Sequence, residues 1–130
     1  MGYALQFDPK HKILLLTVSG TLTEAIMLDA YAAVGRFVSA EGACAGIADF
    51  SAVEQLEVSA DFVRGLAARS PAIPPGHLRV AVAPKPSIFA MNRMFELYRD
   101  SMGGEYQVVH TFEEACALLG CEAPQFTVAV

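Results

Sequence analysis

The sequence is poor in cysteine and in basic residues, and each shortage argues against particular classes of protein. Cys44, Cys116 and Cys121 make an odd number of cysteines without any CxxC spacing, which argues against a disulfide framework and a metal cluster. We interpret them as reduced thiols that serve as small hydrophobic side chains. Nine basic residues against fourteen acidic ones give a net charge of −5, which disfavours nucleic acids and anionic membrane surfaces as partners.

Long apolar runs and targeting signals are also missing. The longest unbroken apolar run is far shorter than the about 20 residues that a membrane-spanning helix needs. The segment Met1–Asp8 lacks the basic start and apolar stretch of a signal peptide. We therefore expect no membrane span and a cytoplasmic location.

No motif for a known reaction is present. The phosphate-binding patterns GxGxxG and GxxxxGK[ST] and the nucleophile pattern GxSxG do not occur. His11, His77 and His110 fall in three separate predicted connections without metal-ligand spacing, so we interpret them as solvated loop residues. The sequence thus predicts a protein that is not an enzyme and has no catalytic residues, metal or cofactor.

What the sequence does contain is apolar side chains, which make up 54% of its 130 residues and predict one domain with a sizeable core. The segment Tyr3–Asp8 alternates apolar and polar residues as a half-buried strand does. Ile13–Val18 is a continuous apolar run typical of a strand buried on both faces. The short polar connection between them predicts an antiparallel hairpin.

Strand and helix patterns alternate through the rest of the chain. Capping boxes at Thr21–Glu24 and Thr111–Glu114 predict two helix starts, and Ser59 is predicted to cap another helix. We expect further strands near residues 45–50, 78–83 and 106–109, and helices near 21–40, 59–67, 87–102 and 111–120. The predicted fold class is α/β, with one five-stranded mixed sheet, about four helices and the order ββαβαβαβα.

We expect an α/β domain over residues 1–120 and a C-terminal tail over 121–130. The tail has the composition of a strand, which favours either an edge strand or a frayed terminus.

The helix predicted over 87–102 is apolar around most of its circumference. One stripe is predicted to pack on the sheet: Ile88, Met91, Phe95, Tyr98 and Met102. Phe89, Met94 and Leu97 lie outside that stripe. Polar residues are confined to a narrow band: Asn92, Arg93, Glu96, Arg99 and Asp100. The surplus apolar side chains favour either deep burial or cover by a partner or ligand, and we predict a homodimer through this helix.

The segment Gly46–Glu54, together with length and element order, resembles the STAS domain, the fold of bacterial anti-sigma-factor antagonists. The family's third strand ends in Asp-Leu-Ser-x-Val, and here Asp49–Val53 reads Asp-Phe-Ser-Ala-Val. The family's next helix begins with a phosphorylated serine, but Val58 stands at that place with Ser59 one step away. The resemblance therefore implies a diverged STAS-like branch, related in fold to CRAL-TRIO lipid-binding domains.

Two functions follow from these observations. The first is a non-enzymatic regulatory or protein-binding domain, as in anti-sigma-factor-antagonist signalling; the alternative is a small carrier of an apolar, lipid-like ligand. Asp49 is open to a ligand-binding interpretation or to a structural one, in which it caps its own turn. The candidate partner or ligand surface consists of Asp49, Ser51, Ser59, Ser87, Phe89, Met94 and Leu97.

Overall fold

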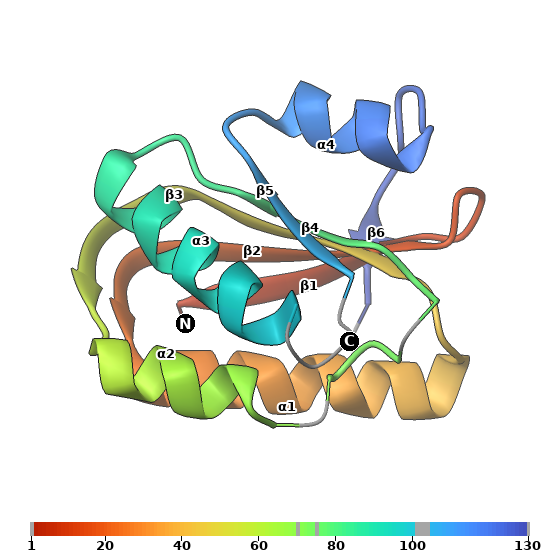
Figure 1. Ribbon diagram of the computed structural model, residues 1–130. Coiled ribbons are helices and arrows are strands. Elements are labelled where there is room, and N and C mark those ends of the chain that lie inside the picture. Colours follow the sequence, from red (N-terminus) through yellow and green to blue (C-terminus); the bar gives the residue numbers. More distant parts are fainter. Residues whose placement is uncertain (1, 70, 75, 101–104, 130) are drawn as a thin grey trace.

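The computed structural model describes residues 2–69, 71–74, 76–100 and 105–129 (Figure 1). The elements in chain order are β1 (Tyr3–Asp8), β2 (Ile13–Thr23), α1 (Glu24–Glu41), β3 (Ala45–Glu57), α2 (Ala60–Ala67), β4 (Arg79–Val82), α3 (Pro86–Asp100), β5 (Tyr106–Val109), α4 (Phe112–Leu119) and β6 (Thr127–Val128). The α/β class and the predicted order from β1 to α4 are confirmed. Met102, expected at the end of α3, lies outside the described residues.

One mixed sheet runs through the molecule in the order β5-β4-β3-β2-β1-β6. Strands β2 to β5 are mutually parallel, and β1 forms the predicted antiparallel hairpin with β2. The sheet has six strands, so the prediction of five was wrong. The sixth is β6 in the tail, where Thr127 and Val128 pair with Phe7 and Gln6 and cover the free edge of β1. Of the two interpretations of the tail, the edge strand is therefore the one the structure supports.

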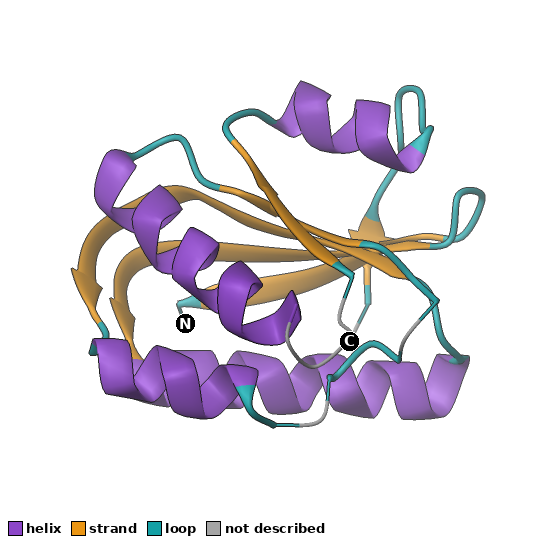
Figure 2. Cartoon of the chain, in the orientation of Figure 1, coloured by secondary structure: helices purple, strands orange, loops and turns teal. Residues whose placement is uncertain are grey.

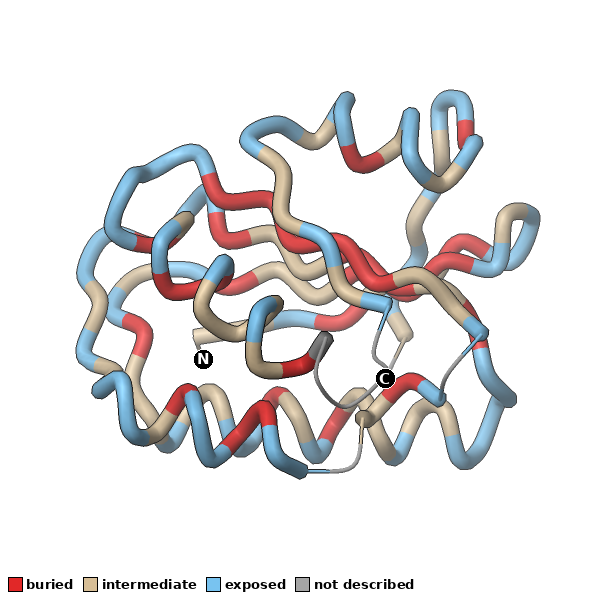
Figure 3. Tube along the Cα trace, viewed as in Figure 1, coloured by how far each residue is buried: buried red, intermediate tan, exposed pale blue. Residues whose placement is uncertain are grey.

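Helices cover the two faces of the sheet unequally. Helix α4 lies on one face, whereas α1, α2 and α3 lie on the other (Figures 1 and 2). The central strands carry the most continuous burial (Figure 3), and Leu14 and Leu15 are only 2% and 7% exposed, which confirms the predicted interior position of β2. Their side chains alternate between the two faces: Leu14 packs with α1, and Leu15 packs in the cluster that contains Ala115 of α4.

Strands β2 and β3 are longer than the sequence indicated. Beyond Asp49, which pairs with Val82 of β4, β3 continues to Glu57 with only β2 beside it (Figure 2). Asp49 therefore lies within a strand, and its predicted position at a strand end was wrong. The capping box predicted at Thr21 was also wrong, because Thr21 belongs to β2 and Thr23 caps α1.

The other helix caps agree with the sequence. The Ser59 hydroxyl accepts a hydrogen bond from the Phe62 N–H at 3.1 Å, and Thr111 and Glu114 form a complete capping box. Gly120 ends α4 with a left-handed φ of 68°, which glycine adopts at little cost.

The face of helix α3 that packs inside the protein includes polar residues as well as part of the predicted apolar stripe. Ile88 and Met91 are buried as expected, but Asn92 and Arg99 are also buried, at 2% and 1% exposure. The narrow polar band of this helix therefore includes two residues that face the interior. Asn92 and Arg99 lie four and eleven positions after Ile88, on the side of the helix that faces the sheet.

Candidate ligand-binding cavity

The predicted surface residues of α3 are mostly covered by the protein itself. Phe89 stacks on His110 with ring centroids 4.2 Å apart and nearly parallel planes. Met94 packs against the core cluster formed with α2 and the sheet. Leu97 remains 60% exposed. Phe89, Met94 and Leu97 were the apolar residues that predicted a partner on this helix. Of these three, Leu97 is the one that is exposed.

The predicted polar residues make local contacts. Asp49 Oδ1 accepts hydrogen bonds from the Ser51 amide at 2.9 Å and from its hydroxyl at 2.6 Å. Ser59 caps α2, and its own amide donates to Glu24 at 3.0 Å. Ser87 is exposed in the first turn of α3. No hydrogen bond or ion pair joins Asp49, Ser51 or Ser87 to a histidine within the described part of the chain, so these residues do not form one catalytic group there.

A cavity of about 130 Å³ lies between the sheet and the three helices α1, α2 and α3. Small side chains are among its lining residues, including Ala48 of β3 and Ala30 of α1. Most of its wall is apolar, with Phe50, Val63 and Met91 among the lining residues. None of the residues predicted from the sequence as a binding surface lines this cavity.

The loop before β4 contributes to the wall at the start of the strands. Ile73 is 5% exposed, and a Cβ atom added to Gly46 would lie 2.6 Å from its Cδ1 atom. Glycine at position 46 therefore allows Ile73 to lie directly over β3. Gly46 pairs with Arg79 in the neighbouring strand, so this end of the cavity is also where Arg79 lies.

Two buried arginines line the cavity: Arg79 of β4 and Arg99 of α3. Arg79 is 8% exposed, and its Nε and Nη2 atoms have no hydrogen-bond partner among the described residues. Burial and, after it, the positive charge of Arg99 lower the pKa of the Arg79 guanidinium. The sequence reasoning missed Arg79, although a charged residue inside the apolar run Leu78–Ala83 was a visible signal.

Arg99 is held by the backbone that leads out of α2. Its Nη1 donates to the Arg69 carbonyl at 2.9 Å, and its guanidinium lies over the Phe95 ring at 4.9 Å. Its Nε atom is buried without a partner among the described residues. Arg99 is therefore fixed in place while one donor stays uncommitted.

Asn92 and Tyr106 form the other polar part of the wall. The Tyr106 hydroxyl donates to Asn92 Oδ1 at 2.7 Å, and Asn92 Nδ2 donates to the Ile88 carbonyl at 3.0 Å. Burial raises the pKa of Tyr106, so the phenol stays protonated and keeps its role as donor. One feature of the sequence could have revealed these residues. Asn92 and Arg99 follow Ile88 at helical spacings of four and eleven residues, which places them on the same face of the helix as Ile88.

The cysteines and the acidic residues are a further group of candidate functional side chains within the ranges that the structure describes. The three cysteines are free thiols, and burial raises the pKa of Cys44 and, with Cys121 beside it, raises that of Cys116 to about 11. No group of three or more His, Cys, Asp or Glu side chains is placed to hold a metal ion in the described ranges.

Comparisons with known proteins assign no family to the chain. No family model matches it, and a search of curated proteins finds no significant match. None of the helices in the described residues is both long and apolar enough to span a membrane.

Proposed function

We propose that this protein binds a small apolar ligand in the cavity between its sheet and helices α1, α2 and α3, as a carrier or sensor and without catalysing a reaction. The observation that carries the proposal is a space of about 130 Å³ with a mostly apolar wall between the sheet and three helices. A dry protein cavity of about 150 Å³ is known to bind benzene, which shows that an apolar space of this order can hold a small hydrophobic molecule.

The position of the cavity favours its interpretation as a ligand-binding site, and not as a packing defect. Its wall draws on the four strands β2 to β5 and on three helices, together with the loop that carries Ile73. It also includes buried polar groups of Arg79, Asn92 and Tyr106, and a few convergent polar groups in an apolar pocket are typical of ligand sites.

A cavity-filling substitution tests the proposal. Ala30→Leu adds apolar volume from α1 into the cavity, and we expect it to weaken binding of 1-octanol at least about tenfold while leaving the unfolding midpoint unchanged or higher. Ala32→Leu makes the same chemical change on the exposed side of α1 and should bind as the wild type does. Isothermal titration calorimetry measures both. Equal binding by the wild type and Ala30→Leu, or no binding of 1-octanol by the wild type, would contradict the proposal.

Regulation through protein binding, in the STAS-like manner that the sequence resembles, is the second candidate, and one observation favours it. Leu97 is 60% exposed on α3, the helix predicted to mediate a homodimer. If α3 carries that contact, sedimentation equilibrium should give twice the chain mass for the wild type and the chain mass for Leu97→Glu, with the fold retained. A wild type that is monomeric at high micromolar concentration would contradict the predicted homodimer.

A further inference from the structure

We propose that the ligand of this cavity is an amphipathic carboxylate, whose headgroup is held by Arg79 and Arg99 while its apolar body fills the space beside α1 and α2. This inference rests on the proposed function, since it names the chemistry of a ligand in the same cavity. It adds a charged headgroup to what the sequence predicted only as an apolar, lipid-like molecule.

The first argument for an anionic headgroup comes from the unpartnered hydrogen-bond donors of Arg79. Nε and Nη2 lie on one edge of the guanidinium plane, and both are buried and unpartnered among the described residues. Two parallel N–H groups on one edge match the two oxygens of a carboxylate, which is the bidentate arrangement that arginine favours. Arg99 Nε supplies a third buried donor in the same cavity wall.

The second argument for an anionic headgroup comes from the charges around Arg79 and Arg99. Arg79 and Arg99 are 92% and 99% buried and act on each other as like charges. The three ion pairs of the described residues involve neither arginine. Glu105 attracts Arg79 electrostatically, but its side chain accepts a hydrogen bond from the Gly76 amide at 2.8 Å and it is exposed. Buried cations are ordinarily paired, so an anion in the cavity would supply the missing compensation.

The arrangement of polar and apolar residues gives the ligand its orientation. Arg79 lies at the start of β4 opposite Gly46, and Phe50 lies four residues further along β3 on the same face. At about 3.3 Å per residue, the charged end and the Phe50 end are roughly 13 Å apart. Phe50, Val63 and Met91 offer only apolar contacts at that far end. A short amphiphile with one anionic end matches this polarity.

The geometry favours a carboxylate over a phosphate ester. A planar carboxylate satisfies the edge of Arg79 with two hydrogen bonds and needs only one more donor, which Arg99 Nε can supply. A phosphate monoester carries about 1.5 to 2 negative charges and three terminal oxygens, so it needs more donors than these three for full satisfaction.

The experiment compares ligands that differ only in headgroup. Calorimetric titrations with octanoate, 1-octanol and octyl phosphate use the full chain after extraction of any bound lipid. We expect the wild type to bind octanoate about ten- to a hundredfold more tightly than 1-octanol, since charge-assisted hydrogen bonds supply the difference. Tighter binding of octyl phosphate than of octanoate would overturn the carboxylate assignment.

Substitution of the arginine separates a headgroup contact from a structural role. Arg79→Met keeps an apolar stem of similar length and should abolish the preference for octanoate while 1-octanol still binds. Its ligand-free unfolding midpoint should stay the same or rise, because an uncompensated buried cation is removed. Arg36→Met, at an exposed position on α1, should keep the preference and serves as the matched control.

The outcomes for the two proposals are distinguishable. If the wild type binds 1-octanol as tightly as octanoate, the headgroup inference is overturned and the apolar cavity function stands. If neither compound binds, both fail. Should Arg79→Met fail to fold, the comparison of octanoate with 1-octanol on the wild type still decides the inference.

Discussion

Replacing Leu22 with alanine is expected to lower the free energy of unfolding by about 2–5 kcal/mol, the range for a buried leucine truncated in a packed core. Leu22 is fully buried and packs in one cluster with Val53 and Val63. It lies in the part of β2 that pairs only with β3, where the hydrogen bonds of the sheet give less support than in the centre. Packing of this ribbon against α2 therefore depends on such side chains.

Urea unfolding followed by circular dichroism measures this loss. Leu118→Ala removes the same atoms from a side chain that is 44% exposed, and we expect it to change the free energy of unfolding by no more than about 0.5 kcal/mol. Equal losses in the two variants would mean that the β2–β3 ribbon does not pack as the structure describes.

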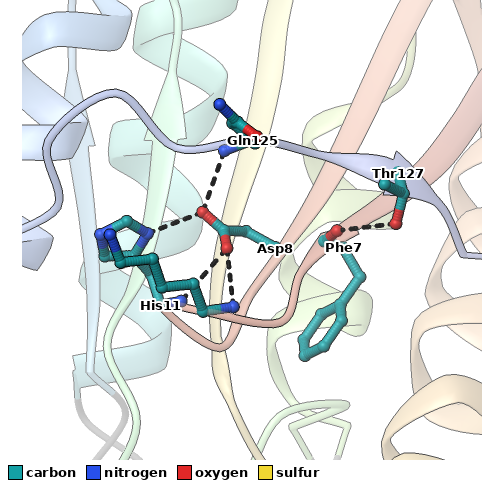
Figure 4. Close-up of polar contacts among 6 residues, drawn as sticks. Phe7, Asp8, His11, Gln125 and Thr127 are labelled. Atoms are coloured by element: carbon teal, nitrogen blue, oxygen red, sulfur yellow. Dashed lines mark hydrogen bonds and ion pairs between the residues drawn. The ribbon is translucent and has the colours of Figure 1, made fainter.

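Replacing Asp8 with asparagine is expected to detach the C-terminal strand. The Asp8 carboxylate is 1% exposed and accepts hydrogen bonds from the Lys10 and His11 amides, the His11 ring at 2.7 Å and the Gln125 amide at 3.1 Å (Figure 4). It thus joins the β1–β2 turn to the tail just before β6. An asparagine amide has one oxygen acceptor and turns an NH₂ group toward these donors, so at least one contact is lost.

The pH dependence of stability gives the direction of this effect. Burial by itself raises the pKa of Asp8, but the hydrogen bonds from His11, Gln125 and Lys10 together outweigh it and hold the pKa below its usual 3.8. The folded state then binds its proton less readily than the unfolded state does. The stabilisation is present above pH 3.8 and is lost as the pH falls through the lower folded pKa. Asp8→Asn should remove this part of the acid dependence.

Two measurements check the Asp8 prediction. Urea midpoints at pH 7 and in the acid range should converge for wild type and Asp8→Asn as the pH falls. Hydrogen exchange at pH 7 should be faster in the variant at the Ala129 amide, which donates to the Leu5 carbonyl at 3.1 Å. Asp61→Asn changes a carboxylate that is 90% exposed and should leave tail exchange unchanged. An unaltered exchange rate in Asp8→Asn would show that β6 is held by other contacts.

The buried arginines would connect stability with the proposed ligand binding. A protein that keeps Arg79 and Arg99 in its interior sacrifices stability, because a buried uncompensated charge is costly. A ligand that compensates this charge would therefore stabilise the folded state, and ligand binding and thermal stability would be linked. Such linkage is the property that a small-molecule sensor needs.

The local features of this protein could be predicted from the order of its residues. The hairpin of β1 and β2, the alternation of strands and helices, and the caps at Ser59 and Thr111 depend on neighbouring residues, whose periodicity and hydrogen-bonding groups are visible in the chain. The pairing of β6 with β1 was one of two interpretations of the tail, because composition indicates a strand without naming its partner.

The length of β3, the inward face of α3 and the cavity depend instead on contacts between parts of the chain that are distant in sequence. Residues 50–57 of β3 extend because β2 continues beside them, a non-local pairing that their own polar residues do not predict. Asn92 and Arg99 can be buried because the Tyr106 hydroxyl of β5 and backbone carbonyls at the end of α2 and just after it supply their hydrogen bonds. The cavity is lined by residues far apart in sequence, such as Ala30 of α1 and Ala48 of β3, and residue spacing contains no information about empty space between them.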